Sequence, residues 1–164
     1  MAASPLEDSS GPALDSTRDL ELAEGQVYSS TSRTPRLSIC IPTLEEQHWI
    51  GHTIRTARAS ARGAQVDAEI IVCDARSRDG TADRARDAGA NVVLEAPRRD
   101  RAHQLNHAAK RATGEIIVLL HADALLTDTG IAGIISAVED GCLGGWFEIE
   151  ILPEDGGILE TNLL

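Results

Sequence analysis

Apolar residues in this chain fall into short runs that predict β-strands. Residues 37–42 (LSICIP) form a β-rich run that a proline ends. Residues 68–73 are too continuously apolar for a half-exposed strand and too short for a helix, and residues 115–120 have the same character. Residues 91–94 form a fourth run. We therefore predict four strands, of which 68–73 and 115–120 are covered on both faces.

Helical periodicity fills the intervals between these runs. Apolar residues recur at helical spacing from Ile50 to Ala61. Thr43 and Glu46, just upstream, have the spacing of a capping box, which predicts that they begin this helix and that it continues to near Gly63. Three more helices are expected: a short one that Gly89 closes, one over 101–112 and one over 128–140.

The order of these elements predicts the fold class. Strands that follow one another through crossover helices are parallel, so we expect an α/β fold, a three-layer sandwich with a mostly parallel central sheet. Residues 145–152 alternate polar and apolar side chains, which predicts a further, half-exposed strand. Ligands of such sheets collect outside the carboxyl ends of the strands. Residues 42–46, Asp74, 95–101 and 121–123 should therefore meet at one edge.

Composition divides the chain into three parts. Residues 1–36 are rich in Ser, Thr, Pro, Gly and acidic residues and predict a disordered acidic leader. Residues 37–152 predict the folded domain, and 153–164 a tail or a truncated continuation of it. No stretch approaches the ~18 consecutive apolar residues of a membrane-spanning helix, and the N-terminus lacks the basic and apolar regions of a signal peptide. We therefore expect a cytoplasmic protein without a transmembrane segment.

Charge narrows the class of ligand. The formal net charge is -11, and residues 112–164 contain neither Lys nor Arg. The overall field of such a chain repels polyanions, so nucleic acid is not an expected partner. Any anionic ligand must be small and held locally. Arg98, Arg99 and Arg101 form the one tight basic cluster, at the start of a predicted helix, where guanidinium and backbone donors suit a diphosphate.

The three cysteines match no metal or disulfide pattern. Cys40, Cys73 and Cys142 are odd in number and widely spaced. Buried free thiols are therefore expected.

Asp74 is the first candidate for ligand binding. It ends the buried run 68–73, and a carboxylate in that position accepts hydrogen bonds from a nucleobase or a ribose. The alternative is a carboxylate that caps local backbone N–H groups. That role suits Asp79 and Ser77 better, because they directly precede a predicted helix.

Asp123 is the second candidate, two residues beyond His121 at the end of the run 115–120. Hard oxygen ligands of this kind hold Mg²⁺ or Mn²⁺ together with phosphate oxygens, and imidazole is acceptable to Mn²⁺. The alternative is a surface-loop carboxylate beside a packed histidine.

Four motifs, taken in order, resemble the family 2 glycosyltransferases of GT-A fold. The resemblance covers about residues 37–147. Its last motif, His-Ala-Asp, is similar to that of a subgroup of small soluble transferases in which it replaces the usual Asp-x-Asp. The motifs are Ser38–Leu44 with Glu46, Ile70–Thr81, Arg101–Asn106 and His121–Asp123.

The resemblance implies a Rossmann-like, nucleotide-diphospho-sugar transferase half and a metal-assisted, inverting transfer of sugar to an acceptor hydroxyl. A UDP-sugar is the favoured donor, and the acceptor and the general base are not assigned. Asp74 would contact the base or ribose, and Asp123 would help to hold Mn²⁺ or Mg²⁺ on the diphosphate. The other donor-binding residues would be Pro42, Thr43, Glu46, Arg101, Gln104, Asn106 and His121.

The chain departs from the usual family pattern at several positions. Ala75 and Arg76 stand where glycines are usual, Glu45 replaces a usual Asn, and Asp100 and Ala108 stand where Gly is common. A second hypothesis therefore stays open: a catalytically silent nucleotide-binding module that acts by association with another protein. A dinucleotide-binding or nucleotidyltransferase domain is not supported, because no Gly-x-Gly-x-x-Gly follows the first strand.

Overall fold

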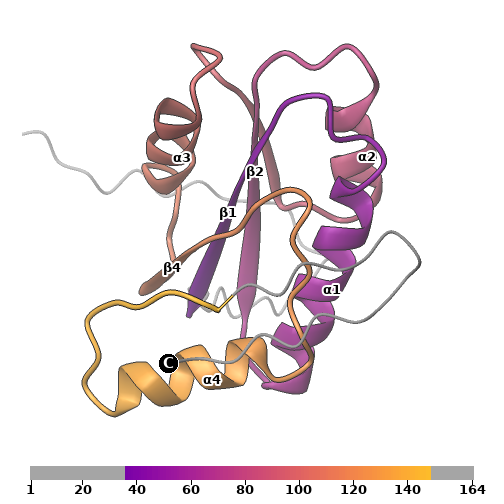
Figure 1. The fold of residues 1–164 in the computed structure, drawn as a ribbon. Coiled ribbons are helices and arrows are strands. Elements are labelled where there is room, and N and C mark those ends of the chain that lie inside the picture. The colour runs from indigo at the N-terminus through magenta and orange to yellow at the C-terminus, as the bar shows by residue number, and fades with distance from the viewer. Residues whose placement is uncertain (1–35, 149–164) are drawn as a thin grey trace, which may run out of the picture. The chain divides into compact units, whose positions relative to one another are not determined.

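A four-stranded parallel sheet forms the centre of the computed structural model, which describes residues 36–148 (Figure 1). The strand order is β3-β2-β1-β4. β1 pairs with β2 along its whole length, from Leu37 opposite Ala68 to Thr43 opposite Asp74. All four predicted strands and their parallel arrangement are therefore confirmed. Their bounds are Leu37–Thr43 (β1), Ala68–Asp74 (β2), Val92–Glu95 (β3) and Ile116–Leu119 (β4).

Helices cover both faces of the sheet, which confirms the three-layer α/β prediction (Figure 1). The larger core packs α1, α2 and α4 against the face of β1 that carries Leu37, Ile39 and Ile41. The smaller core packs α3 against the opposite face, around Cys40 and Cys73. The helices are α1 (Ile50–Gly63), α2 (Thr81–Asp87), α3 (Arg101–Ala109) and α4 (Gly130–Glu139).

β4 is covered on one face only, and the prediction of a doubly buried strand is wrong here. Ile117 and Leu119 are 47% and 54% exposed, whereas Val118 between them is buried. β4 lies at the edge of the sheet, and α3 packs mainly on β1 and β2. The register places Ile117 beside Ser38, on the face of the sheet that α3 covers. α3 does not extend as far as β4, so Ile117 stays exposed.

The first helix begins later than its predicted capping box. Thr43 is the last residue of β1, and α1 begins only at Ile50, with Trp49 at the N-cap and no side-chain cap. The prediction that Thr43 and Glu46 begin α1 is therefore wrong. α3 ends at Ala109 rather than at residue 112.

The C-terminal predictions lie partly beyond the described residues. Within 145–148 only Phe147 forms an isolated bridge, so no strand is present there, and 149–152 lie outside the described residues, as do 1–35 and the predicted tail. Cys40 and Cys73 are buried free thiols as predicted, whereas Cys142 is exposed. No helix within 36–148 is long and apolar enough to span a membrane.

Candidate functional site

Asp74 is buried at the carboxyl end of β2, and the chain itself supplies three donors to its carboxylate. The residue is 5% exposed. The Thr43 hydroxyl donates to Oδ1 over 2.9 Å, and the Ser77 hydroxyl donates to the same oxygen over 2.6 Å. The backbone N–H of Ser77 donates to Oδ2 over 2.8 Å. These bonds satisfy a buried charge and fix the orientation of the carboxylate.

The loops after β1 and β2 are joined by side chains of the second loop. Three consecutive backbone N–H groups, at positions 45, 46 and 47, donate to the Ser77 hydroxyl, the Thr81 hydroxyl and the Asp79 carboxylate over 2.8, 2.8 and 3.1 Å. Residues 45–47 therefore bond to a segment about thirty residues further on and form a loop ahead of α1, rather than its first turn. Asp79 also accepts from the N–H of Thr81, as its predicted structural role requires.

These bonds lower the pKa of Asp79. Its slight burial alone would raise the pKa, but hydrogen bonds from Thr81 and from the Gln47 N–H stabilise the ionised form and outweigh it. The loop is therefore held by a carboxylate that stays charged well into the acid range.

Two residues that depart from the family pattern have left-handed backbone. Glu45 has φ 58° and Arg76 has φ 62°. An L-residue with a side chain in this conformation costs about 1–2 kcal/mol relative to the right-handed region. The hydrogen bonds of the joined loops, including that from the Arg78 N–H to Glu45 Oε1 (3.0 Å), offset this cost.

Gln104 connects α3 to the carboxyl ends of β1 and β2. The side chain is buried, and its Nε2 donates to the carbonyl oxygens of Thr43 (2.8 Å) and Cys73 (2.7 Å). Both N–H groups of this amide therefore hold the ends of β1 and β2. Gln104, predicted as a donor-pocket residue, thus positions the backbone around Asp74.

The segment after β4 brings Asp123 to the same edge. The hydroxyl of Thr53 in α1 donates to the carbonyl of Ala122 over 2.6 Å and so anchors the segment, while His121 and Asp123 themselves are exposed. Burial raises the pKa of Glu46, the charges of Asp123 and Asp79 raise it further, and Arg101 opposes them. Glu46, Asp123 and Arg101 therefore lie close enough to interact electrostatically.

These residues fit a cation that a ligand helps to hold. Within 36–148 no group of three His, Cys, Asp or Glu side chains could hold a metal ion by itself. Mg²⁺ is, however, commonly bound through one or two carboxylates together with substrate phosphates. Asp123 and the nearby Glu46 provide such a pair, and a bound cation would offset the charge of Asp123, which adds to burial in raising the pKa of Glu46.

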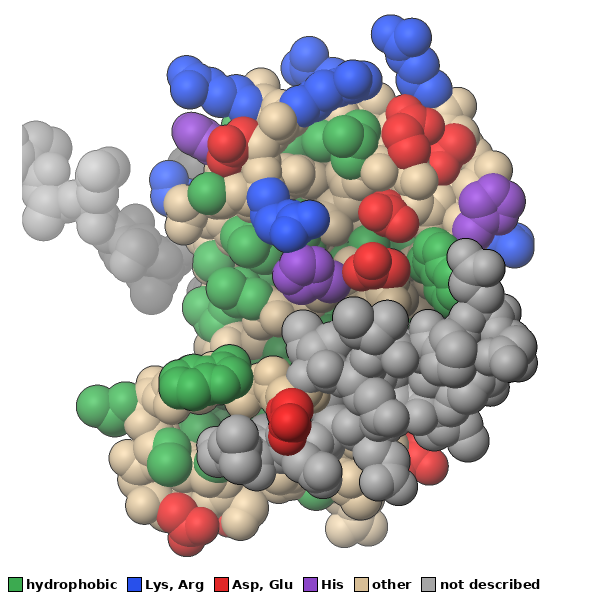
Figure 2. Space-filling model, viewed as in Figure 1, with side chains coloured by type: hydrophobic (Ala, Val, Ile, Leu, Met, Phe, Trp, Pro, Cys, Tyr) green, Lys and Arg blue, Asp and Glu red, His purple; other side chains and the backbone are tan. Residues whose placement is uncertain are grey.

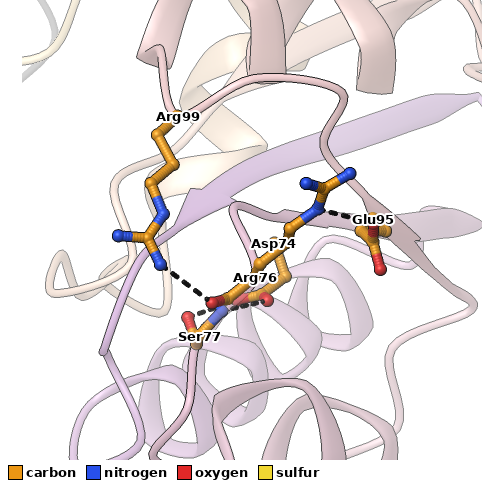
Figure 3. Close-up of polar contacts among 5 residues, drawn as sticks. All are labelled: Asp74, Arg76, Ser77, Glu95 and Arg99. Carbon is orange, nitrogen blue, oxygen red and sulfur yellow. Dashed lines mark hydrogen bonds and ion pairs between the residues drawn. The ribbon is translucent and has the colours of Figure 1, made fainter.

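Arg76, Glu95 and Arg99 surround the exit of β2 (Figure 3). Arg76 Nε pairs with Glu95 Oε1 at 2.7 Å, and Arg99 Nη2 donates to the carbonyl of Arg76 at 3.4 Å. Arg99, predicted to hold a diphosphate, is thus placed beside Asp74, whereas Arg101 lies within interaction range of Glu46. Sequence reasoning did not single out Arg76 or Glu95 as site residues; the only signal was an arginine where glycine is usual.

The remaining predicted residues differ in their placement. Pro42 is half-buried next to Thr43 in β1 and lies at the edge. Asn106 is exposed and follows the buried Gln104 by two residues, about 200° around α3, so it lies on the side away from the sheet. The structure therefore gathers Thr43, Glu46, Asp74, Arg101, His121 and Asp123 at the edge, and does not bring Asn106 there.

The surface at the carboxyl edge of the sheet carries more charged side chains than the rest of the face drawn in Figure 2. Figure 2 shows Lys and Arg side chains along the upper rim, with Asp, Glu and His side chains just below them, where Figure 1 places the carboxyl ends of β1 and β2. Among the described side chains visible in the lower part of this view, Lys and Arg are absent and Asp and Glu are scattered singly (Figure 2). Charged groups of both signs at this edge suit a ligand that combines a phosphate with hydrogen-bonding groups.

A parallel sheet with helices on both faces defines an α/β domain of the Rossmann-like class. Residues 38–150 match the model of the family described as Glycosyl transferase family 2. This match spans more than half of the chain, and the chain belongs to glycosyl transferase family 2, as its motifs indicated.

Relatives extend well beyond this chain. The low-salt glycan biosynthesis hexosyltransferase Agl6 of Haloferax volcanii is 29% identical over 123 residues, 73% of this chain and 29% of Agl6. The mannosyltransferase PcManGT from Pyrobaculum calidifontis, solved with GDP-Man and Mn²⁺, is 30% identical with a TM-score of 0.60 over 70% of this chain and 35% of that one. The M. tuberculosis glucosyl-3-phosphoglycerate synthase shares the fold at 24% identity and TM-score 0.54, over 63% of this chain and 40% of that one. The chain thus spans about a third of the length of these relatives.

Proposed function

We propose that this domain binds a nucleotide-sugar at the carboxyl edge of its sheet, together with Mn²⁺ or Mg²⁺, and is the donor-binding half of an inverting glycosyltransferase. The observation that carries the proposal is the gathering of a fixed buried carboxylate, Asp74, with Asp123 and Arg101 at a single edge. The relative PcManGT binds GDP-Man and Mn²⁺, which supports this class of ligand.

Each group has a role that follows from its placement. Asp74 accepts from an N–H of the base or an O–H of the ribose, and Thr43, Ser77 and Gln104 position it. Arg101 donates to the diphosphate. Asp123 is the carboxylate that shares a divalent cation with the diphosphate oxygens. A divalent cation supplies charge stabilisation for the departing nucleoside diphosphate.

The reaction joins an acceptor hydroxyl to the anomeric carbon. The acceptor oxygen attacks this carbon from the side opposite the leaving group, the bond between the anomeric carbon and the diphosphate oxygen breaks, and a general base takes the hydroxyl proton. The residues described here act mainly on the leaving group, where Arg101 stabilises the growing negative charge.

The first test is calorimetric titration of nucleoside diphosphates and their sugars into the full chain, with and without Mn²⁺. We expect Mn²⁺ to tighten binding, and Asp123→Asn to abolish this tightening while changing stability by less than about 1 kcal/mol, because Asp123 is exposed. Asp140, which is also exposed and caps the end of α4, provides the matched control: Asp140→Asn should bind as the parent does. No metal-dependent binding by the parent protein would refute the proposal.

A silent nucleotide-binding module is the second candidate. It is favoured by the left-handed Arg76 and Glu45, because side chains at these positions narrow the backbone approach that the usual small residues allow. Release of nucleoside diphosphate together with a sugar-bearing product identifies the enzyme. Tight donor binding without such release, across a panel of acceptors, identifies the module.

A further inference from the structure

We propose that His103 and His107, two histidines of α3, form a binding site for a divalent transition-metal ion. The ion is one for which imidazole is a preferred ligand, such as Ni²⁺ or Zn²⁺, and Asp100 positions one of the two rings. The site is separate from the carboxylates of the carboxyl edge. It does not rest on the proposed function, because it needs no nucleotide.

The spacing of the two histidines places them on one face of α3. Both lie within Arg101–Ala109, four residues apart, and side chains at this spacing are neighbours with Cβ atoms about 5–6 Å apart. Helical side chains incline toward the N-terminus, which brings His107 toward the turn that carries His103. Gln104 and Ala108 form the buried face, and the histidines lie about 100° around the helix from them. The side chain of His103 is 51% exposed, so a cation from solvent can reach this face.

The contact between His103 and Asp100 leaves the other ring nitrogen available to a metal. Nδ1 of His103 lies 2.9 Å from Oδ1 of Asp100, and the same oxygen accepts from the backbone N–H of His103 over 2.8 Å. An ionised carboxylate can only accept, so in the neutral ring Nδ1 carries the proton and Nε2 presents its lone pair. Histidines that bind metals commonly donate their second N–H to a carboxylate, which fixes the tautomer and makes the ligating nitrogen more basic.

No group of the described chain occupies the nitrogens that would bind the metal. Nε2 of His103 and both ring nitrogens of His107 have no hydrogen-bond or ion-pair partner among residues 36–148. Two nitrogens make an incomplete coordination shell, since no group of three His, Cys, Asp or Glu side chains in this part of the chain could hold a metal. The remaining positions are left to water or to a donor atom of another molecule, so binding should be reversible.

Asp100 makes this site a feature of the individual chain. It is one of the departures from the usual family pattern, in which glycine is common at this position. A glycine there would leave the ring of His103 without a carboxylate partner. The proposed site is therefore distinct from the donor pocket that the family shares.

A second pair of histidines has the same spacing and lacks the other features. The chain has five histidines, among them His48 and His52, which are both exposed. His48 lies before α1, which begins at Ile50, so the helix holds only one member of this pair. Neither ring contacts a carboxylate within residues 36–148. This pair therefore provides the matched control.

The test is calorimetric titration of Ni²⁺ into the full chain without nucleotide. Ni²⁺ is the probe because the exposed thiol of Cys142 would compete for Zn²⁺. We expect the parent to bind Ni²⁺ and to unfold at a higher temperature in its presence. His103→Ala and His107→Ala should each lower the affinity at least about tenfold, because a single imidazole loses the gain from two linked contacts. His52→Ala should bind as the parent does.

The role of Asp100 has its own readout. Asp100→Ser keeps a good N-cap for α3, but its side chain is too short to reach Nδ1 of His103. It should therefore lower the Ni²⁺ affinity about tenfold, with little change in thermal unfolding in the absence of metal. Asp100→Asn keeps an acceptor oxygen for Nδ1 and should recover part of the loss.

The outcomes decide between a metal site and ordinary surface histidines. The proposal is overturned if the parent binds no Ni²⁺, if His103→Ala, His107→Ala or Asp100→Ser stays within twofold of the parent, or if His52→Ala loses as much affinity. A loss confined to the α3 variants, with Asp100→Asn between the parent and Asp100→Ser, supports it. The proposed function fails separately, because its test reads nucleoside diphosphate binding with Mn²⁺.

Discussion

Glu69 provides a quantitative test of what stabilises the domain away from the carboxyl edge of its sheet. One oxygen, Oε1, accepts from the Ser38 hydroxyl (2.6 Å), the Thr113 N–H (2.6 Å) and the Thr113 hydroxyl (2.9 Å). These contacts join β1, β2 and the segment that precedes β4. Glu69→Gln keeps an acceptor oxygen but removes its charge, and bonds to a charged acceptor are roughly twice as strong as neutral ones. With about 0.5–1 kcal/mol lost per bond, the variant should be about 2 kcal/mol less stable at pH 7.

The pH dependence gives the sign of this effect. Partial burial would raise the pKa of Glu69, but the bonds from Ser38 and Thr113 outweigh it and hold the pKa below its ordinary value. The stabilisation is therefore fully present above the unfolded-state pKa of about 4.3 and disappears as the pH falls through the lower pKa of the folded state. The variant and the parent should converge in acid.

Urea denaturation followed by circular dichroism, from pH 7 down to pH 3, measures this difference. Glu139→Gln is the matched control, because Glu139 is 59% exposed and, among residues 36–148, forms a surface ion pair with Arg36 alone. It should change stability by less than about 1 kcal/mol at every pH. A Glu69→Gln difference that is absent at pH 7, or that stays constant down to pH 3, would refute the reasoning.

Two further predictions concern buried groups. Burial, with a smaller contribution from neighbouring charges, raises the pKa of both Cys40 and Cys73 to about 11. At pH 8 an alkylating reagent should therefore modify only the exposed Cys142. Mass spectrometry that finds more than one rapid adduct on the folded protein would contradict this. Gln104→Leu removes two hydrogen bonds to strand-end carbonyls and should lower the free energy of unfolding by about 1–3 kcal/mol, as measured in urea; a change below about 0.5 kcal/mol would show that these bonds are replaced.

The parts of the fold that the sequence predicted best are those that local pattern determines. The apolar run 68–73 is buried on both faces because it lies inside the sheet. The run 115–120 is just as continuously apolar, yet β4 lies at an edge, where Ile117 and Leu119 are exposed. Strand order depends on contacts between distant segments, so a one-dimensional pattern does not distinguish a central strand from an edge strand.

The candidate site shows the same limit. Parallel topology correctly placed Asp74 and Asp123 at one edge, because carboxyl ends of parallel strands meet there. The role of Thr43 was misjudged, because Glu46 at capping distance gives a local explanation while its actual partner is Asp74 on the next strand. Arg76 was noticed only as a departure, since its backbone conformation and its pairing with Glu95 are properties of the folded chain.

The hydrogen bonds that join the two loops at positions 45–47 have a consequence for binding thermodynamics. Ser77, Asp79 and Thr81 already hold both loops in place in the folded domain. The entropy cost of ordering these loops is therefore part of the free energy of folding and does not reduce the affinity for a ligand. Under the proposed function, a nucleotide would meet loops that are already ordered. The affinity should then depend mainly on how well the polar groups of the ligand match those of the loops, because little induced fit takes place on binding.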